Sequence, residues 1–255
     1  MKLRNIKAVI FDMDGVLIDA KEWHFIALNR ALQLFGLEIT RQAHLSEFDG
    51  LPTRTKLDII SRTKSLPRAL HSFINQMKQI YTIEAINSHC VPNATRINAL
   101  KSLKNDGYKL ALCSNSISQT IEIMLEKSHL SKFLDFYLSN ESVANPKPSP
   151  EIYIKAIAKL NLTPREVLIV EDNKNGIIAA KGSGAFVMEI SDIAEVNYEN
   201  IKRVIAKCEA KEVQLDSQNQ DSRDAKDSRL LQNPAQNMGD SQDSHNLNPH
   251  SKDSQ

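Results

Sequence analysis

Five short apolar runs, each the length of one β-strand, constrain the fold of this chain more than any other feature. Each run is nearly continuous rather than alternating, which is typical of strands that helices cover on both faces. Segments with helical periodicity lie between the later runs. This order predicts an α/β fold with a doubly wound, parallel, Rossmann-like sheet at its core. The runs are Ala8–Asp12, Lys109–Cys113, Phe133–Leu138, Val167–Val170 and Ala185–Ile190.

The helices of this core are predicted from periodicity and from their end signals. Ala94–Asn105 stops at Asp106-Gly107, and Ser118–Lys127 and Pro150–Leu160 follow. Pro150 suits the first turn of its helix, where the missing N–H has no partner in any case. These helices would cover the two faces of the sheet.

Residues 20–87 interrupt the alternation of strands and helices. They contain no convincing strand, and apolar residues recur at helical spacing over Leu28–Phe35 and from Leu70 to Tyr81. A helical module is therefore predicted after the first strand. The expected organisation is core at 1–19, helical module at 20–87 and the rest of the core at 88–212.

The composition changes sharply near residue 212. Residues 213–255 contain no aromatic residue and eight of Ala, Val, Ile, Leu and Met, and they are rich in Asp, Ser, Gln and Asn. Ordering the backbone would cost roughly 1–2 kcal/mol per residue. Burying an apolar side chain returns only about 2 kcal/mol, so we expect a disordered tail.

The charges of the chain nearly balance, with 32 Lys and Arg against 31 Asp and Glu and a formal net charge of +1. This balance argues against a protein that mainly binds nucleic acid or an anionic membrane. Cys90, Cys113 and Cys208 form no CxxC pair, which argues against a zinc site or a disulfide framework. The apolar run after the N-terminus is too short for a signal peptide or a membrane span. We expect a soluble, cytoplasmic monomer.

Side chains that can do chemistry follow four of the predicted strands, at or beyond the point where each strand ends. The carboxyl ends of parallel strands share one edge of a sheet, and open α/β sheets bind their ligands there. Carboxylates crowded at this edge repel one another unless a cation joins them, and oxygen ligands favour Mg²⁺. A lysine and a hydroxyl beside them would complement a phosphate. The residues are Asp12 and Asp14, Ser114 and Asn115, Lys147, and Glu171 and Asp172.

Each of these motifs alone has an ordinary structural explanation, as a turn, a helix cap or an exposed loop lysine. Their joint occurrence, in this order and each beyond a strand, favours a site for phosphoryl chemistry. The chain has no Walker sequence, no GxGxxG fingerprint and no EF-hand loop. These absences argue against nucleoside triphosphatases, dinucleotide-binding proteins and calcium-binding proteins of those types.

The combined motifs resemble the haloacid dehalogenase superfamily of phosphohydrolases, in the branch similar to beta-phosphoglucomutase and phosphoglycolate phosphatase. The resemblance covers roughly residues 5–195. The four motifs of the family match Asp12-Met13-Asp14-Gly15-Val16-Leu17-Ile18-Asp19, then Ser114 with Asn115, then Lys147 in Lys147-Pro148-Ser149-Pro150-Glu151-Ile152-Tyr153, and finally Glu171-Asp172.

The resemblance implies catalytic and metal-binding roles for the four acids. Asp12 is implied to be the nucleophile that forms an aspartyl-phosphate. Asp14 is implied to be the general acid and then the base for water. Asp12, Asp14 through its backbone carbonyl, and Asp172 are implied to hold Mg²⁺, with Glu171 assisting.

The resemblance also implies residues that bind the substrate, a small phosphorylated metabolite. Ser114, with Asn115 beside it, and Lys147 would hold the phosphoryl group, and Lys147 would steady the nucleophile. The helical module matches the family's α-helical cap, which closes over the site and excludes water. The cap candidates, for which a solvated helix face or a helix cap is the alternative, are His24, Arg54 and Lys78.

Two residues after the first motif depart from the family pattern. Many members carry Ser or Thr and then Glu there, whereas this chain has Ala20 and Lys21. The absent hydroxyl, with Arg54 one place later from Gly50 than in the mutase, favours simple hydrolysis. Glu22-Trp23-His24 still resembles the mutase.

Three functions follow from these residues. The favoured one is Mg²⁺-dependent hydrolysis of a small phosphomonoester, with sugar phosphates among the candidates. Phosphoryl transfer of the beta-phosphoglucomutase type is the first alternative. A non-catalytic phosphate-binding or regulatory protein is the alternative of another class, and the intact acids argue against it.

Overall fold

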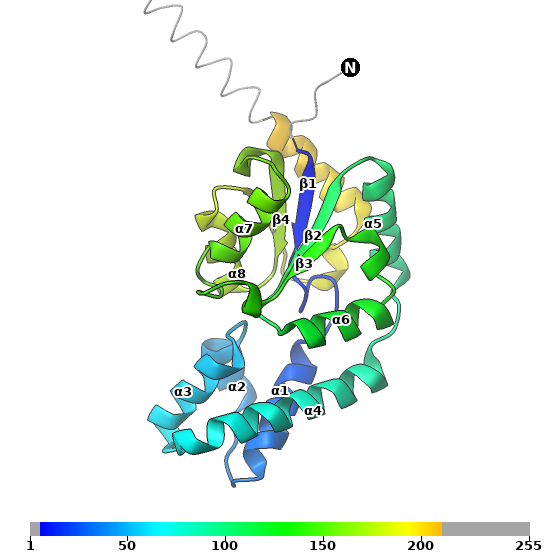
Figure 1. The fold of residues 1–255 in the computed structure, drawn as a ribbon. Coiled ribbons are helices and arrows are strands. Elements are labelled where there is room, and N and C mark those ends of the chain that lie inside the picture. The colour runs from blue at the N-terminus through cyan, green and yellow to red at the C-terminus, as the bar shows by residue number, and fades with distance from the viewer. Residues whose placement is uncertain (1–5, 211–255) are drawn as a thin grey trace, which may run out of the picture. The chain divides into compact units, whose positions relative to one another are not determined.

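The structure, a computed structural model, describes residues 6–210. The predicted tail at 213–255 lies outside these described residues. The core is a five-stranded sheet in the order β3-β2-β1-β4-β5, and every neighbouring pair is parallel (Figure 1). The predicted α/β fold class is confirmed. The strands are β1 (Ala8–Phe11), β2 (Lys109–Cys113), β3 (Phe136–Leu138), β4 (Val167–Glu171) and β5 (Phe186–Glu189).

The central strand β1 sets the level at which the neighbouring strands end. Ala8 lies opposite both Lys109 of β2 and Val167 of β4, and the three strands stay in register to their carboxyl ends. All four residues of β1 are fully buried. The residues that follow β1, β2 and β4 therefore emerge at one edge of the sheet.

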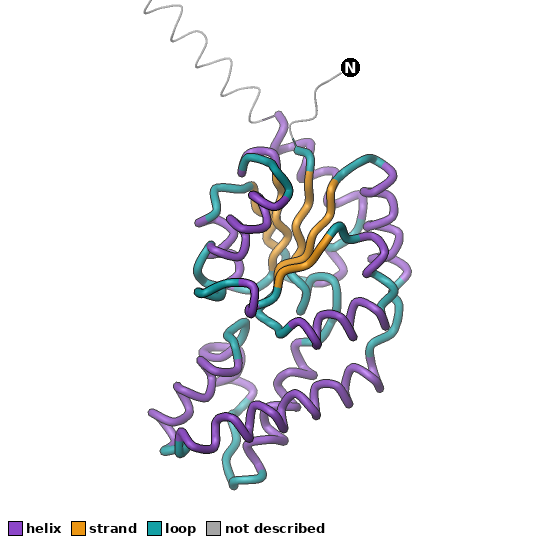
Figure 2. Tube along the Cα trace, in the orientation of Figure 1, coloured by secondary structure: helices purple, strands orange, loops and turns teal. Residues whose placement is uncertain are grey.

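Helices cover both faces of the sheet, as continuous apolar strands require. Val9 and Phe11 pack into the hydrophobic cluster on one face, and Ala8 and Ile10 pack into the cluster on the other. Figure 2 shows the strands between two layers of helices. The first face is covered by α5 (Ala94–Asn105), α6 (Ser118–Lys127) and the helical residues 198–210, and the second by α7 (Glu151–Lys159) and α8 (Lys174–Gly182).

The helical module lies beyond the carboxyl edge of the sheet (Figure 1). It has its own hydrophobic cluster, which includes Leu28, Leu57, Ile60 and Ile74. This is the expected α-helical cap; its predicted limits at residues 20 and 87 stay a prediction. Its helices are α1 (Lys21–Gln33), α2 (Arg41–Ala43), the π-helical turn His44–Phe48, α3 (Thr53–Lys64) and α4 (His71–His89).

The helix predicted over Leu70–Tyr81 is longer than its apolar pattern indicates. The buried face of α4 carries Ile74, Lys78, Thr82 and Ile86, at a spacing of four residues. Two of these four residues are polar, so the apolar periodicity breaks while the helical periodicity continues.

The third strand is shorter than the predicted run Phe133–Leu138, because pairing with β2 starts only at Phe136. Phe133 ends a 3₁₀ turn and packs against the core from outside the sheet. The start of the apolar run therefore packs against the core as part of a turn, and only its end, Phe136–Leu138, forms a strand.

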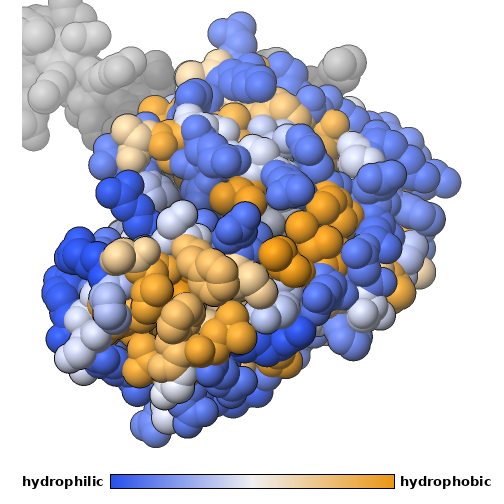
Figure 3. Space-filling model, turned by 60° about the horizontal axis from the view of Figure 1, so that its bottom comes forward, coloured by the Kyte–Doolittle hydropathy of each residue, from blue (hydrophilic) through white to orange (hydrophobic). Residues whose placement is uncertain are grey.

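Part of the cap surface is apolar. Figure 3 shows hydrophobic residues gathered in patches among hydrophilic ones. The exposed large apolar side chains include Ile26 on α1 and Phe73 and Ile80 on α4. Phe73 and Phe35 form an edge-to-face pair with ring centroids 5.9 Å apart. No helix within residues 6–210 is long and apolar enough to cross a bilayer.

Candidate active site

The residues predicted from the sequence meet at the carboxyl edge of the sheet. Asp12 directly follows β1, and its backbone N–H donates to the carbonyl of Val170 at 3.0 Å. Ser114 directly follows β2, and its N–H donates to the carbonyl of Leu138. One cavity of about 410 Å³ opens here, and residues of both core and cap line it. The predicted residues that line it are Asp12, Asp14, His24, Arg54, Lys78, Ser114, Asn115, Lys147 and Glu171.

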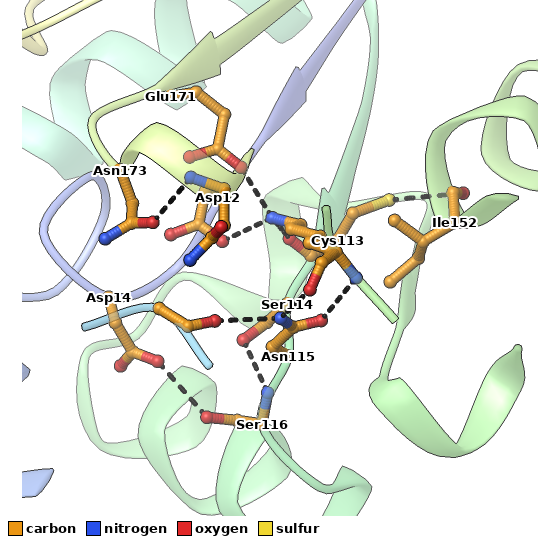
Figure 4. A network of polar contacts seen from close by, with 12 residues as sticks. Asp12, Asp14, Cys113, Ser114, Asn115, Ser116, Ile152, Glu171 and Asn173 are labelled. Atoms are coloured by element: carbon orange, nitrogen blue, oxygen red, sulfur yellow. Dashed lines mark hydrogen bonds and ion pairs between the residues drawn. The ribbon is translucent and has the colours of Figure 1, made fainter. Parts of the chain in front are cut away.

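The ammonium of Lys147 lies at the centre of the site. Its Nζ is 2.6 Å from Asp12 Oδ1, 2.6 Å from Glu171 Oε1 and 2.8 Å from the carbonyl oxygen of Cys113. In Figure 4, the labelled side chains of Asp12 and Glu171 lie close to each other. Burial alone would lower the pKa of Lys147, but the two carboxylates outweigh it and raise the pKa. All three of its protons are used, so Lys147 stays charged and fixed.

The side chain of Glu171 is held inside the protein. The hydroxyl of Tyr153 donates to Glu171 Oε1 at 2.5 Å, and the N–H of Asp172 donates to Oε2 at 3.2 Å. A Cβ at Gly176 would lie only 2.0 Å from Oε1, so a glycine is needed at this close approach. No role was predicted from the sequence for Tyr153 or Gly176, although both lie within a few residues of predicted site residues.

Three carboxylates of the site could hold a metal ion together. Asp12, Glu171 and Asp172 offer ligand atoms that all lie within 4.8 Å of one another. Burial, with the neighbouring carboxylates, raises the pKa of Asp12 well above its ordinary value despite Lys147. Burial also raises the pKa of Asp172 to about 6, although Lys21 opposes the shift. The site therefore lacks positive charge.

One atom of this group supports a cation directly. Asp172 Oδ1 is buried and has no hydrogen-bond partner among the described residues. A buried polar atom without a partner is costly, and a metal ion would supply the missing contact. The donor set is oxygen only, which fits a hard divalent cation.

Lys21 supplies part of the missing charge. Its ammonium contacts Asp172 Oδ2 and lies 4.0 Å from Asp49 Oδ2. Burial would lower the pKa of Lys21, but these carboxylates raise it. Lys21, which departs from the family pattern, thus lies beside the cluster of carboxylates.

The carboxylate of Asp14 is directed away from the three clustered acids. Ser116 Oγ donates to Asp14 Oδ2 at 3.1 Å, and His24 Nε2 lies 3.2 Å from Oδ1. Burial alone would raise the pKa of Asp14, but His24, Lys78 and Ser116 outweigh it and lower the pKa. The side chain of Asp14 is therefore no member of the acidic cluster, and a metal contact through its backbone carbonyl stays a proposal. No role was predicted from the sequence for Ser116, which directly follows Ser114 and Asn115.

The cap candidates occupy different positions. Lys78 is buried, and its Nζ lies 3.1 Å from His24 Nδ1, so a solvated helix face is the wrong description for it. Burial, with Lys56 nearby, lowers the pKa of Lys78 to about 7. Burial and Lys78 also lower the pKa of His24. Arg54 lines the cavity but is exposed.

Ser114 and Asn115 differ in how their side chains are used. The hydroxyl oxygen of Ser114 is buried at the cavity and accepts from the N–H of Ser116 at 3.0 Å. Asn115 donates to the carbonyls of Gly50 and Lys147, at 2.9 and 3.1 Å, and accepts from the N–H of Lys147. Asn115 thus positions the lysine loop and a cap loop, and its contact with substrate stays a prediction.

The cap loop at Asp49 and Gly50 is seated on the core by two more asparagines. Asn173 Nδ2 donates to Asp49 Oδ2 at 2.7 Å, and Asn175 Nδ2 donates to the carbonyl of Asp49 at 3.2 Å. Gly50 has φ +71°, and a Cβ there would lie 2.2 Å from Asn173 Oδ1. These asparagines follow the fourth motif directly, and only the structure shows that they reach the cap.

The cap also brings two basic residues to the cavity that sequence reasoning missed. Lys56 and His44 both line the cavity and both are buried. Burial, opposed by Asp49 and Asp14, lowers the pKa of Lys56 to about 8. Burial and the charge of Lys56 lower the pKa of His44 to about 4. The sequence around these two residues is polar, so it gave no indication that their side chains are buried.

Comparison with known proteins agrees with the fold. The family model for haloacid dehalogenase-like hydrolases matches residues 9–190. The chain is 32% identical over 182 residues to a phosphorylated carbohydrates phosphatase of Thermotoga maritima, covering 70% of this chain and 82% of that protein. It is 27% identical over 179 residues to a phosphoglycolate phosphatase of Aquifex aeolicus, covering 70% and 82%.

A solved structure extends the likeness of fold. The beta-phosphoglucomutase of Clostridium difficile superposes with a TM-score of 0.70 at 23% identity. The match covers 79% of this chain and 98% of that one. At this identity the likeness concerns the fold alone.

We predict that Lys56→Met stabilises the protein, and more at pH 7 than at pH 10. Lys56 has a pKa of about 8 when folded and 10.5 ordinarily. Between these values the unfolded chain binds more protons, so the free energy of unfolding of the wild type rises with pH. In Lys56→Met, the free energy of unfolding no longer contains this dependence on pH. Thermal melting should show a gain of about 3 °C or more at pH 7 that shrinks at pH 10.

The control is Lys64→Met, on the exposed end of the same helix. It should melt with the wild type at both pH values. A gain for Lys56→Met that is equal at pH 7 and pH 10 would mean that packing, not buried charge, causes it.

Proposed function

The chain belongs to the haloacid dehalogenase-like hydrolase family and is a phosphohydrolase, and we propose that it is a Mg²⁺-dependent phosphatase that hydrolyses a small phosphomonoester through an aspartyl-phosphate. The observation that carries this proposal is the cluster of Asp12, Glu171 and Asp172 with Lys147, of which Asp12, Glu171 and Lys147 line the cavity. The name of the relative from Thermotoga maritima supports phosphorylated carbohydrates as substrates. A cytoplasmic monomer remains our expectation from the sequence.

In the first step, a carboxylate oxygen of Asp12 attacks phosphorus, and the bond from phosphorus to the ester oxygen breaks. Lys147 holds Asp12 through the 2.6 Å contact with Oδ1. Ser114, buried at the cavity, provides a hydroxyl for a phosphoryl oxygen. The leaving oxygen takes a proton from Asp14, which gives the free alcohol and the aspartyl-phosphate.

In the second step, Asp14 takes a proton from a water molecule, whose oxygen attacks the aspartyl-phosphate. Phosphate leaves and the carboxylate of Asp12 is restored. The lowered pKa of Asp14, due to His24, Lys78 and Ser116 against burial, suits this step. The first step needs Asp14 protonated, and the negative charge of a bound phosphate raises the pKa of a nearby carboxyl.

Asp12, Asp172 and the backbone carbonyl of Asp14 would hold the Mg²⁺, with Glu171 behind them. When bound, this cation supplies positive charge to the phosphoryl oxygens. The unpartnered Asp172 Oδ1 and the raised pKa of Asp12, which burial causes, support this assignment.

Phosphoryl transfer between two positions of a sugar phosphate is the second candidate. It is favoured by the way cap helices α1, α3 and α4 line the cavity, because such transfer must exclude water. Against it, Ala20 is buried without a hydroxyl to offer, and Arg54 is exposed. Hydrolysis is therefore the proposal we favour.

Replacing the nucleophile tests the covalent step. Asp12→Asn keeps the shape of the side chain but removes the attacking charge, so kcat should fall by about 10⁴-fold or more. Release of p-nitrophenol from p-nitrophenyl phosphate measures this. Glu199→Gln, an exposed acid outside the cavity, is the control and should keep full activity. If Asp12→Asn retained a tenth of the wild-type rate, roughly 1.4 kcal/mol of barrier, another group would be the nucleophile.

Removing divalent metal tests the cofactor. Excess chelator should abolish phosphate release, and Mg²⁺ should restore it, because the clustered acids would repel a phosphate without a cation. Ca²⁺ should restore little, since its looser coordination spoils the alignment of the reacting atoms. Full activity in excess chelator would contradict a metal-dependent reaction.

The last experiment separates hydrolysis from transfer. Beta-glucose 1-phosphate is supplied with a trace of the 1,6-bisphosphate, and inorganic phosphate and glucose 6-phosphate are followed in one tube. We expect inorganic phosphate to form faster, because the cap offers no hydroxyl at Ala20. Glucose 6-phosphate forming about ten times faster than phosphate, a difference of about 1.4 kcal/mol between the two barriers, would favour the mutase.

A further inference from the structure

The two halves of the cavity differ in their ionisable side chains. The core half contains Asp12, Glu171 and Lys147, to which the proposed function assigns the phosphoryl group. The cap half contains several basic side chains beside neutral residues and Asp49. The basic side chains are His24, His44, Arg54, Lys56, His71 and Lys78.

The acids near this cap half are already engaged. Asp14 Oδ2 accepts from Ser116, and its Oδ1 faces His24. Asp49 accepts from Asn173. The cap half therefore has more basic groups than acids free to pair with them.

Lys56 shows this excess most clearly. Its side chain is 8% exposed, yet its ammonium forms no hydrogen bond or ion pair with any residue in the described range 6–210. Lys78 is also 8% exposed, and its ammonium contacts a ring nitrogen of His24 rather than a carboxylate. Buried charges are normally paired, because an unpaired one costs free energy of folding.

His44 adds a ring nitrogen without a hydrogen-bond partner among the described residues. His44 is 4% exposed, and the nitrogen concerned is its buried Nδ1. Its Nε2 lies 4.0 Å from Asp49 Oδ1, and its ring packs on Phe25. Lys56 and His44 are close enough for the charge of Lys56 to lower the pKa of the histidine, after burial.

The missing partner of these groups fits a ligand in the cavity. Both side chains line the same cavity, whose volume of about 410 Å³ leaves room beyond a phosphoryl group. A sugar hydroxyl can accept a hydrogen bond but cannot neutralise a buried ammonium. An oxyanion does both, through charge-assisted hydrogen bonds.

We propose that the cap half of the cavity, at Lys56 and His44, is a subsite for a second acidic group of the substrate. The preferred substrates are then phosphomonoesters that carry a carboxylate or a second phosphate, rather than phosphates of neutral sugars. This inference rests on the proposed phosphatase function and specifies its substrate class. It also gives a reason why a lysine is kept at a buried position where it lowers stability.

Matched substrate pairs test the subsite. The first pair is 2-phosphoglycolate against 2-hydroxyethyl phosphate, which differ by a carboxylate. The second pair is glucose 1,6-bisphosphate against glucose 1-phosphate, which differ by a phosphate. We expect kcat/KM to be about tenfold or more higher for the acidic member of at least one pair, and the pair that responds identifies the acidic group.

Variants connect this preference to Lys56. Lys56→Met and the polar Lys56→Gln should each reduce the preference for the acidic member by about tenfold, because the neutral member makes no use of the ammonium. Lys64→Met, on the same helix but outside the cavity, should retain it. Thermal melting shows which variants are folded. If one of the two Lys56 variants does not fold, the other still tests the subsite.

Binding is measured independently of turnover. The members of both pairs are titrated calorimetrically into Asp12→Asn, with and without Lys56→Met. Tighter binding of an acidic member, if Lys56→Met abolishes it, supports the subsite. A failure to hydrolyse any of these substrates would count against the phosphatase function and not against the subsite. Equal binding and equal kcat/KM of acidic and neutral members, or a preference that both Lys56 variants keep, would overturn the subsite.

Discussion

The ammonium of Lys147 is the contact on which the site depends. It joins Asp12 after β1, the carbonyl of Cys113 at the end of β2 and Glu171 at the end of β4, each within 2.8 Å. The lysine itself comes from the loop after β3. Four distant segments therefore converge on one buried charge. Removing that charge would leave two carboxylates buried side by side, which is far more costly than losing an exposed ion pair.

The core side of the cavity has an excess of acidic groups, and the cap side has an excess of basic groups. The core side crowds Asp12, Glu171 and Asp172 and lacks positive charge, even with Lys147 and Lys21 beside them. The cap side buries Lys56 without a carboxylate partner among the described residues. A divalent cation would compensate the first side. A substrate with two acidic ends would complement the cation and the second side together.

The fold and the core of the site could be predicted from local patterns. Continuous apolar strands and helix stops led to a parallel sheet, and its geometry brings Asp12, Ser114 and Glu171 to one edge. The prediction was weaker where polar residues occupy buried positions. Lys78 and Thr82 lie on the buried face of α4, so the apolar pattern ended eight residues before the helix did, at Tyr81 rather than His89.

By itself, the sequence determined that this chain builds an α/β core with its reactive groups at the strand ends, because strand and helix periodicities are properties of neighbouring residues. Only the tertiary structure decided which of those groups meet. Asp14 turns to His24 and Ser116, Asn115 ties two loops, and Lys56 is buried at the cavity. Burial and pairing depend on elements distant in the chain, so the role of a lysine at the start of a polar helix is set by what folds over it.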